Sequence, residues 1–219
     1  MSEKKELERR SFIFDIRAEE GAESGGVLTG RPIVYNSRTD LGWFDEVIEP
    51  GALDKADLTD VRFLVNHDTR KLPLARSRRN TPNSTMQLTT DLQGMAIRVN
   101  LDTENNADAK ALYSAVQRGD ITGMSFMFSV DDERWENLES DHPVRHINAI
   151  STVVEVSAVT FPAYEATEIN ARSKEALENA RLALDNARRS ADDSGSVDTD
   201  LELAKAKFDF IKKLGGIRL

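Results

Sequence analysis

The stretch Asp120-Ile121-Thr122-Gly123-Met124-Ser125-Phe126-Met127-Phe128-Ser129-Val130 reads as a turn that leads into a buried strand. Its side chains alternate at the period of a strand, with Met124, Phe126, Phe128 and Val130 on one face and Ser125, Met127 and Ser129 on the other. Ser125 is thus a hydroxyl on a rigid element, two residues after a glycine. It is either a nucleophile or a small polar residue on the solvent face of a half-buried strand.

Short apolar segments surround this strand on both sides. We expect further strands over residues 11–17, 30–35, 44–48, 62–67, 86–90, 95–101, 145–150 and 152–161. One helix is expected over residues 107–118, capped by Asn105 or Asn106. So many strands with so few helices indicate an α+β, mainly β fold with a closed or strongly curved, mixed-to-antiparallel sheet.

The composition divides the chain into three parts. Residues 1–10 are highly charged and are expected to form a disordered arm, residues 11–171 the β domain, and residues 172–219 a helical tail with an acidic linker. The tail carries two narrow apolar seams at helical spacing, formed by Leu177, Ala180, Leu184 and Ala187 and by Leu201, Ala204, Phe208 and Ile211. Such seams pack on the domain, self-associate or bind a partner helix.

Composition also excludes several functions. The chain has 219 residues, a formal net charge of −9 and a pI of about 5.0, which argues against a general nucleic-acid binder. It has no cysteine, so disulfides, thiolate catalysis and cysteine-based zinc sites are excluded. The first ten residues lack an apolar core and no apolar run reaches membrane-spanning length, so we expect an intracellular protein without a signal peptide or membrane contact.

No cofactor or metal site is predicted. His142 and His146 are four residues apart, but Pro143 would break a helix that placed them on one face. The sequence also lacks a glycine-rich phosphate loop and the GxSxG turn of the α/β-hydrolases. Any serine chemistry must therefore use another scaffold.

A Ser/His site needs a base beside the serine and a third group that orients the base. His67 ends a predicted buried strand and could be the base. Glu155 interrupts an apolar strand, where a carboxylate is costly unless it is paired, so it could be the orienting group. His146 and Asp68 are rival third members, and Glu155 could instead face solvent.

At this point the chain resembles the prohead (capsid maturation) serine proteases of tailed bacteriophages, distant relatives of the herpesvirus assembly proteases. The resemblance covers roughly residues 10–170 and rests on the order of six motifs, which lie at residues 30–36, 44–53, 65–68, 74–76, 123–126 and 155–163. It implies a mostly antiparallel β-barrel flanked by helices. It also implies Ser125 as nucleophile, His67 as general base and Glu155 rather than His146 as third member, with Ala163 and Tyr164 near an oxyanion hole.

The resemblance further implies an endopeptidase that cleaves the scaffold protein, or the scaffold-like region of the major capsid protein, and itself. It would act inside the assembling prohead in the bacterial cytoplasm, with self-association as a further expectation and without a cofactor. Ser125 would point into a shallow groove toward His67, and the tail would serve in targeting or be removed by autocleavage. The alternatives are a non-catalytic β-barrel scaffold or assembly protein of the phage head and a generic β-barrel binding module.

Overall fold

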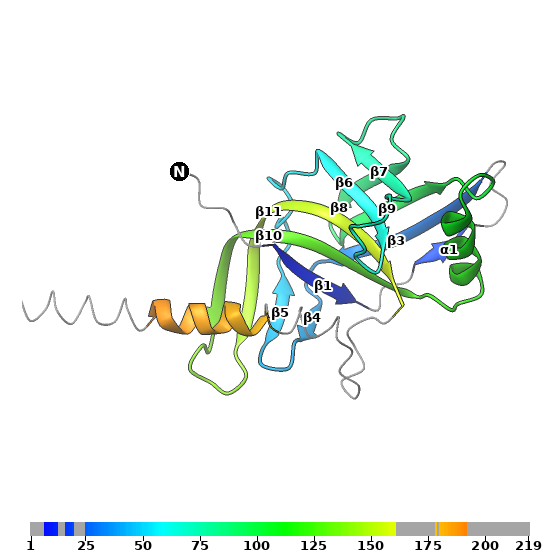
Figure 1. Ribbon diagram of the computed structural model, residues 1–219. Coiled ribbons are helices and arrows are strands. Elements are labelled where there is room, and N and C mark those ends of the chain that lie inside the picture. The colour runs from blue at the N-terminus through cyan, green and yellow to red at the C-terminus, as the bar shows by residue number, and fades with distance from the viewer. Residues whose placement is uncertain (1–6, 13–15, 20–24, 161–177, 179, 192–219) are drawn as a thin grey trace, which may run out of the picture.

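The computed structural model describes residues 7–12, 16–19, 25–160, 178 and 180–191 (Figure 1). Its labelled elements are β1 (Glu8–Phe12), β2 (Arg17–Ala18), β3 (Gly26–Val34), β4 (Arg38–Asp40), β5 (Asp45–Ile48), β6 (Asp60–Val65), β7 (Ala75–Arg78), β8 (Met86–Asp91), β9 (Gly94–Leu101), α1 (Ala107–Gln117), β10 (Gly123–Glu136) and β11 (Val144–Val159). Residues 180–191 form a second helix. The predicted α+β, mainly β fold is confirmed.

The described strands form two sheets instead of one closed barrel. The larger sheet has the order β1-β10-β11-β5-β4, and β6 also pairs with β11 and carries β7 at its outer side. The smaller sheet has the order β2-β3-β9-β8. Pairing is antiparallel throughout except that β11 runs parallel to both β5 and β6. One long strand, β11, therefore pairs with β5 along its first residues and with β6 near its end.

The β10–β11 hairpin is longer than the sequence suggested, because the segments expected at residues 145–150 and 152–161 merge into one continuous strand over Val144–Val159. Bulges let this strand bend without ending. Met127 pairs with Glu155, whereas the next residue, Phe128, pairs with Val153, so Val154 is the extra residue of a bulge. Val153 consequently lies in the core, although simple alternation placed it on the face of Glu155.

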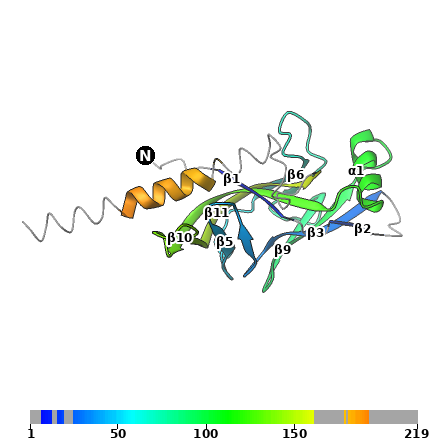
Figure 2. The same cartoon turned by 90° about the horizontal axis from the view of Figure 1, so that it is seen from below.

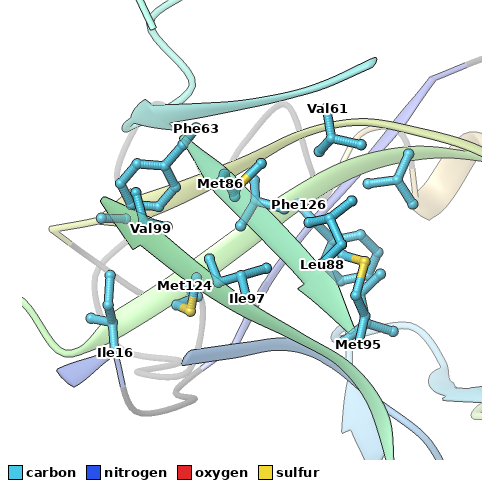
Figure 3. Close-up of a cluster of buried hydrophobic side chains, with 14 of the residues drawn as sticks. Ile16, Val61, Phe63, Met86, Leu88, Met95, Ile97, Val99, Met124 and Phe126 are labelled. Carbon is cyan, nitrogen blue, oxygen red and sulfur yellow. The ribbon is translucent and has the colours of Figure 1, made fainter. Parts of the chain in front are cut away.

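The main core lies between the two sheets (Figure 3). Met124 and Phe126 of β10 meet Phe63 of β6, and Met86 and Val99 of the smaller sheet close the cluster; all five are fully buried. Because Phe128 is also fully buried, the predicted core face of the central strand is confirmed.

Helix α1 covers one end of the sheets (Figure 1). Its predicted cap is confirmed, since the Asn106 side chain accepts hydrogen bonds from the backbone N–H groups of Asp108 and Ala109. The strands expected over residues 86–90 and 95–101 are found as β8 and β9, which pair as a hairpin. It turns at Gly94, whose φ of +133° and close approach to the Ile33 carbonyl leave no room for a side chain.

The two ends of the described chain both lie against the larger sheet (Figures 1 and 2). Residues 8–10, predicted to belong to a disordered arm, instead begin β1, because their backbone completes the edge of β10. At the other end, Ala180 and Leu184 of the second helix pack on Phe44, beside Trp135. Neither α1 nor the helix at residues 180–191 is long and apolar enough to cross a membrane.

Candidate active site

A constrained turn at the end of β6 positions His67. Asn66 and His67 both have left-handed backbone conformations, with φ of +53° and +58°. Non-glycine residues adopt this region uncommonly, although asparagine and histidine are enriched there, so surrounding contacts must hold the turn. The Asn66 side chain does this: its Nδ2 donates to Thr160 Oγ1, and its Oδ1 accepts from the Thr160 backbone N–H, both at 3.0 Å. The turn is thereby tied to the end of β11.

His67 and Glu155 are in contact, as the sequence suggested. His67 Nδ1 is hydrogen-bonded to Glu155 Oε1, and the Glu155 residue is only 3% exposed. Ser157 supports both groups: its Oγ donates to Glu155 Oε2 at 2.7 Å and accepts from the His67 backbone N–H at 3.1 Å. A carboxylate only accepts hydrogen bonds, so it selects the tautomer with the proton on Nδ1.

The other ring nitrogen of His67 is then an acceptor. Among the described residues, none is hydrogen-bonded to His67 Nε2, and the side chain is 13% exposed. An imidazole that is oriented at Nδ1 and open at Nε2 has the arrangement of a general base. The sequence did not reveal the role of Ser157, although its alternation with Glu155 on the same strand was a usable signal.

Ser125 lies on the strand next to this cluster. It is directly opposite Ser157 in the β10–β11 register, and such cross-strand neighbours have Cβ atoms about 4.5–5.5 Å apart. The predicted open groove is wrong for this structure, because Ser125 is 0% exposed. Its Oγ donates a hydrogen bond to the backbone carbonyl oxygen of Arg10 in β1 at 2.7 Å.

The remaining predicted site residues do not join His67. His146 lies in the first half of β11, where Nδ1 is 2.7 Å from Glu49 Oε1 and Nε2 is 3.3 Å from Glu136 Oε2. Asp68 follows His67 in sequence, but its carboxylate accepts from Arg70 Nε at 3.1 Å. Ala163 and Tyr164 lie outside the described residues.

A buried cluster of charged side chains, which the sequence analysis missed, holds β1 in place. It consists of Glu8, Arg10, Glu46, Glu133 and Arg145. Arg10 Nε donates to Glu46 Oε1 at 2.5 Å, and Arg145 Nη1 donates to Glu8 Oε2 at 2.6 Å. Arg10, Glu46 and Arg145 are each 2% exposed. We call these five side chains the ion cluster.

In the ion cluster, each of the three carboxylates pairs with at least one of the two guanidiniums. Burial alone would raise the pKa of the Glu8 carboxyl, but Arg10 and Arg145 outweigh it and lower that pKa from 4.5 to about 2. The pKa of Arg145 is raised, because the neighbouring carboxylates outweigh its own burial. The ion cluster could have been noticed from Glu46 and Arg145, which interrupt apolar strands at inward-facing positions.

One group in the described part of the chain has the composition of a cation site. Asp40, Asp45 and His142 bring their ligand atoms within 4.8 Å of one another. The Asp45 carboxylate already accepts hydrogen bonds from Arg38 Nε at 2.5 Å, however, and Asp40 and His142 are exposed. The group is therefore a surface ion-pair cluster and gives no reason to infer a metal.

The described residues thus include an oriented histidine, a buried carboxylate and a serine on the adjoining strand, which are the residue types that a Ser-His-acid hydrolase uses. The family model of the caudovirus prohead serine proteases matches residues 12–181, and the chain belongs to this family.

Two individual proteins also match the chain, each with less than 30% sequence identity. The prohead protease of Enterobacteria phage HK97 is 29% identical over 160 residues, which are 71% of this chain and 64% of that protein. The present chain thus spans less than two thirds of the length of this relative. The structure of the bacteriophage T4 capsid assembly protease matches with a TM-score of 0.41 and 13% identity, over 72% of this chain and 98% of that one.

Proposed function

We propose that this protein is a serine endopeptidase of phage capsid maturation, with Ser125 as nucleophile, His67 as general base and Glu155 as the group that orients His67. The observation that carries the proposal is the His67–Glu155 pair, held by Ser157 directly opposite Ser125. Membership of the prohead serine protease family supports the same activity. His146 is not included, because its contacts are with Glu49 and Glu136.

The geometry suits an acyl-transfer mechanism. Ser125 Oγ attacks the carbonyl carbon of the scissile peptide bond while His67 Nε2 takes the hydroxyl proton. Glu155 keeps the Nδ1–H bond and stabilises the resulting imidazolium. His67 then gives its proton to the leaving amine, and an acyl-enzyme ester forms at Ser125. Water attacks that ester, His67 takes a proton from the water, and the proton returns to Ser125.

The oxyanion of each tetrahedral intermediate needs backbone N–H donors, which in studied serine proteases contribute about 3–4 kcal/mol each. Ala163 and Tyr164 are assigned here only from the family resemblance. Side-chain recognition has a candidate in a pocket of about 300 Å³ next to the His67 turn. Val65 and Asp68 line one side of it, and Leu112 of α1 lines another. Its mainly apolar lining suits an aliphatic substrate side chain.

The substrates that fit this family are the scaffold protein, the scaffold-like region of the major capsid protein, and the protease itself. The relative in phage HK97 is named as a prohead protease, which supports action inside the assembling prohead in the bacterial cytoplasm. The tail, residues 172–219, is proposed to target the protein to that assembly. These assignments involve no nucleic acid, membrane, cofactor or metal.

The nucleophile is tested by co-expressing the cognate major capsid protein with wild type, Ser125→Ala or Ser129→Ala. Ser129 lies on the same strand and is 2% exposed, so its variant controls for a lost buried hydroxyl. We expect capsid-protein processing to fall by about 10³-fold or more in Ser125→Ala and to persist in Ser129→Ala. Undiminished processing in Ser125→Ala would rule out this nucleophile.

One observation favours the alternative of a non-catalytic assembly protein: Ser125 is fully buried and bonded to Arg10. A fluorophosphonate reagent distinguishes the two functions, because it forms a covalent bond only with an activated serine. Labelling of Ser125 in the full-length protein supports the protease. A protein that assembles with capsid protein but is never labelled supports the scaffold.

A further inference from the structure

Strands β6 and β7 carry a group of arginines beside the candidate active site. We propose that this basic patch, formed by Arg62, Arg76 and Arg78, binds the acidic stretch of the tail, residues 192–202, of a second copy of the chain. The contact itself does not depend on catalysis. Its consequence, which is delivery of the tail to His67 and Ser125 for cleavage by another copy, rests on the proposed function.

The strand register places the basic patch next to Glu155. Arg62 of β6 pairs with Glu155 of β11, and residues paired in this way point to the same face of a sheet. Arg62 is in turn opposite Arg76 of β7. Arg78 is opposite Asp60 in the same pair of strands. Since neighbouring strands lie about 4.8 Å apart, the basic patch begins one strand away from the carboxylate that orients the general base (Figure 1).

The three guanidiniums of the basic patch share one carboxylate. Arg76 donates to both oxygens of Asp60, at 2.5 and 2.7 Å, and Arg62 Nη2 donates to Asp60 Oδ2 at 3.0 Å. Within the described ranges of the chain, Arg78 forms no ion pair. The pKa of Asp60 is lowered, first by the hydrogen bond from Arg76 and further by the nearby charges of Arg62 and Arg78. Like charges directly opposite each other destabilise a sheet, so this arrangement has a cost that the fold itself does not explain.

The basic patch is accessible and keeps a net positive charge. The Arg62 and Arg76 side chains are 43% and 37% exposed, and Arg78 is exposed. The flanking residues Asp57 and Arg79 have opposite charges, so they leave the excess of two positive charges unchanged. The basic patch therefore contrasts with the chain as a whole, whose formal net charge is −9.

The basic patch offers side chains, and not a free strand edge, to a ligand. Strand β7 lies at the outer side of β6. Its Arg76 backbone N–H donates to Thr85 Oγ1 at 2.9 Å, however, and its Arg78 backbone N–H donates to Ser84 Oγ at 3.0 Å. These bonds occupy the edge of β7. Guanidinium groups bind carboxylates through paired, charge-assisted hydrogen bonds, so the chemistry fits an acidic peptide.

The tail of the chain contains such a peptide. The acidic stretch has no lysine or arginine and carries five carboxylates, those of Asp192, Asp193, Asp198, Asp200 and Glu202. The helix before it, residues 180–191, packs on Phe44 and extends away from the sheets on the side opposite α1 (Figures 1 and 2). The acidic stretch therefore begins far from the basic patch of its own chain.

A second copy reaches the basic patch more easily than the same chain does. Arg145, which contacts Trp135 near the helix, and Glu155, which pairs with Arg62, are ten residues apart in β11, or about 33 Å along a strand. The acidic stretch spans at most about 40 Å when fully extended. Within one chain, only its last residues would arrive, at full extension. A second copy needs no such extension, and the contact it makes is head-to-tail.

Self-association of the full-length protein tests the proposal. All forms carry Ser125→Ala, which prevents cleavage of the tail under the proposed mechanism. The patch variant is Arg62→Gln/Arg78→Gln, which keeps the third arginine of the basic patch and its carboxylate partner. Its control, Arg98→Gln/Arg118→Gln, removes two arginines that form surface ion pairs elsewhere. The tail variant replaces each aspartate of the acidic stretch by asparagine and its glutamate by glutamine.

Sedimentation velocity measures the dissociation constant for self-association of each form. We expect this constant to rise at least about ten-fold in the patch variant and in the tail variant, and to stay within about two-fold in the control. An equimolar mixture of the patch and tail variants should associate again, because it restores one complete contact between an intact tail and an intact basic patch. Added salt should weaken the association, since the charges are exposed.

Undiminished self-association of the patch variant, a mixture that stays dissociated, an equal loss in the control, or a parent protein that does not self-associate would each overturn the proposal. Thermal unfolding followed by circular dichroism verifies that every variant is folded. Fluorophosphonate labelling of the patch variant with Ser125 restored reports separately on the proposed nucleophile. Failure of the contact and failure of the protease function are therefore distinguishable.

Discussion

The two halves of β11 carry buried polar clusters that differ in one respect. In the first half, Arg145 belongs to the ion cluster, where every charge is paired with an opposite one. In the second half, Glu155 and Ser157 hold His67 through Nδ1 and the backbone but leave Nε2 available. The ion cluster, whose charges are paired, stabilises the fold, whereas the cluster around His67 has an available acceptor at Nε2 that can take a proton.

The largest effect expected from this difference is on catalysis. Glu155→Gln keeps the size of the side chain but removes the charge that stabilises the His67 imidazolium. We expect kcat for cleavage of a capsid-protein substrate to fall by about 10²–10⁴-fold with little change in KM. The matched variant Glu136→Gln changes an exposed carboxylate that contacts His146. It should leave kcat within about two-fold of wild type, and a comparable loss there would contradict the assignment of Glu155.

The next largest effect should be on stability. Arg145→Met leaves the carboxylates of Glu8, Glu46 and Glu133 with less compensation, and breaking such buried pairs typically costs about 3–5 kcal/mol. Arg98→Met is the control, because Arg98 pairs with Glu19 at the surface, where such pairs contribute about 0–1 kcal/mol. Urea unfolding of both variants measures the two costs, and equal costs would show that the ion cluster does not stabilise the fold.

A smaller effect should appear as the pH falls. The pKa of Glu8 is lowered from 4.5 to about 2 in the fold, so its stabilising contribution is complete above about pH 4.5 and is lost as the pH falls toward 2. A difference of this size corresponds to about 3 kcal/mol. The free energy of unfolding of wild type and Glu8→Gln should therefore converge over this range. A gap that stays constant down to pH 2 would show that Glu8 titrates normally.

Much of β10 and of the second half of β11 could be predicted from the sequence because their signals are local. Alternation placed Met124, Phe126 and Phe128 in the core, and Glu155 was recognisable as a carboxylate in an apolar strand. The bulge at Val154 was not predictable, since it arises from the pairing of two strands and leaves no local pattern. The role of Ser157 was not predicted, because one of its two contacts is with the backbone of His67, 90 positions away in the chain.

The contacts of the first half of β11 and of the ion cluster form between residues that are far apart in the sequence. The hydrogen bond from Ser125 to Arg10 joins residues 115 positions apart, and a charged segment such as residues 1–10 reads as exposed when its partners are unknown. Glu8 and Arg10 are buried only because Glu46 and Arg145 compensate them. The same missing information made Ser125 appear to face an open groove.

The helix at residues 180–191 reaches the ion cluster through two aromatic rings. It packs on Phe44, whose ring meets Trp135 edge to face at 4.8 Å, and the Arg145 guanidinium lies 5.9 Å from the Trp135 ring. Strand β1 contacts the same guanidinium through Glu8. Strand β1 thus contacts Arg145 directly and the helix contacts it through Trp135, and thermodynamic linkage makes their effects on each other reciprocal. We expect that loss of either the strand or the helix loosens the hold on the other.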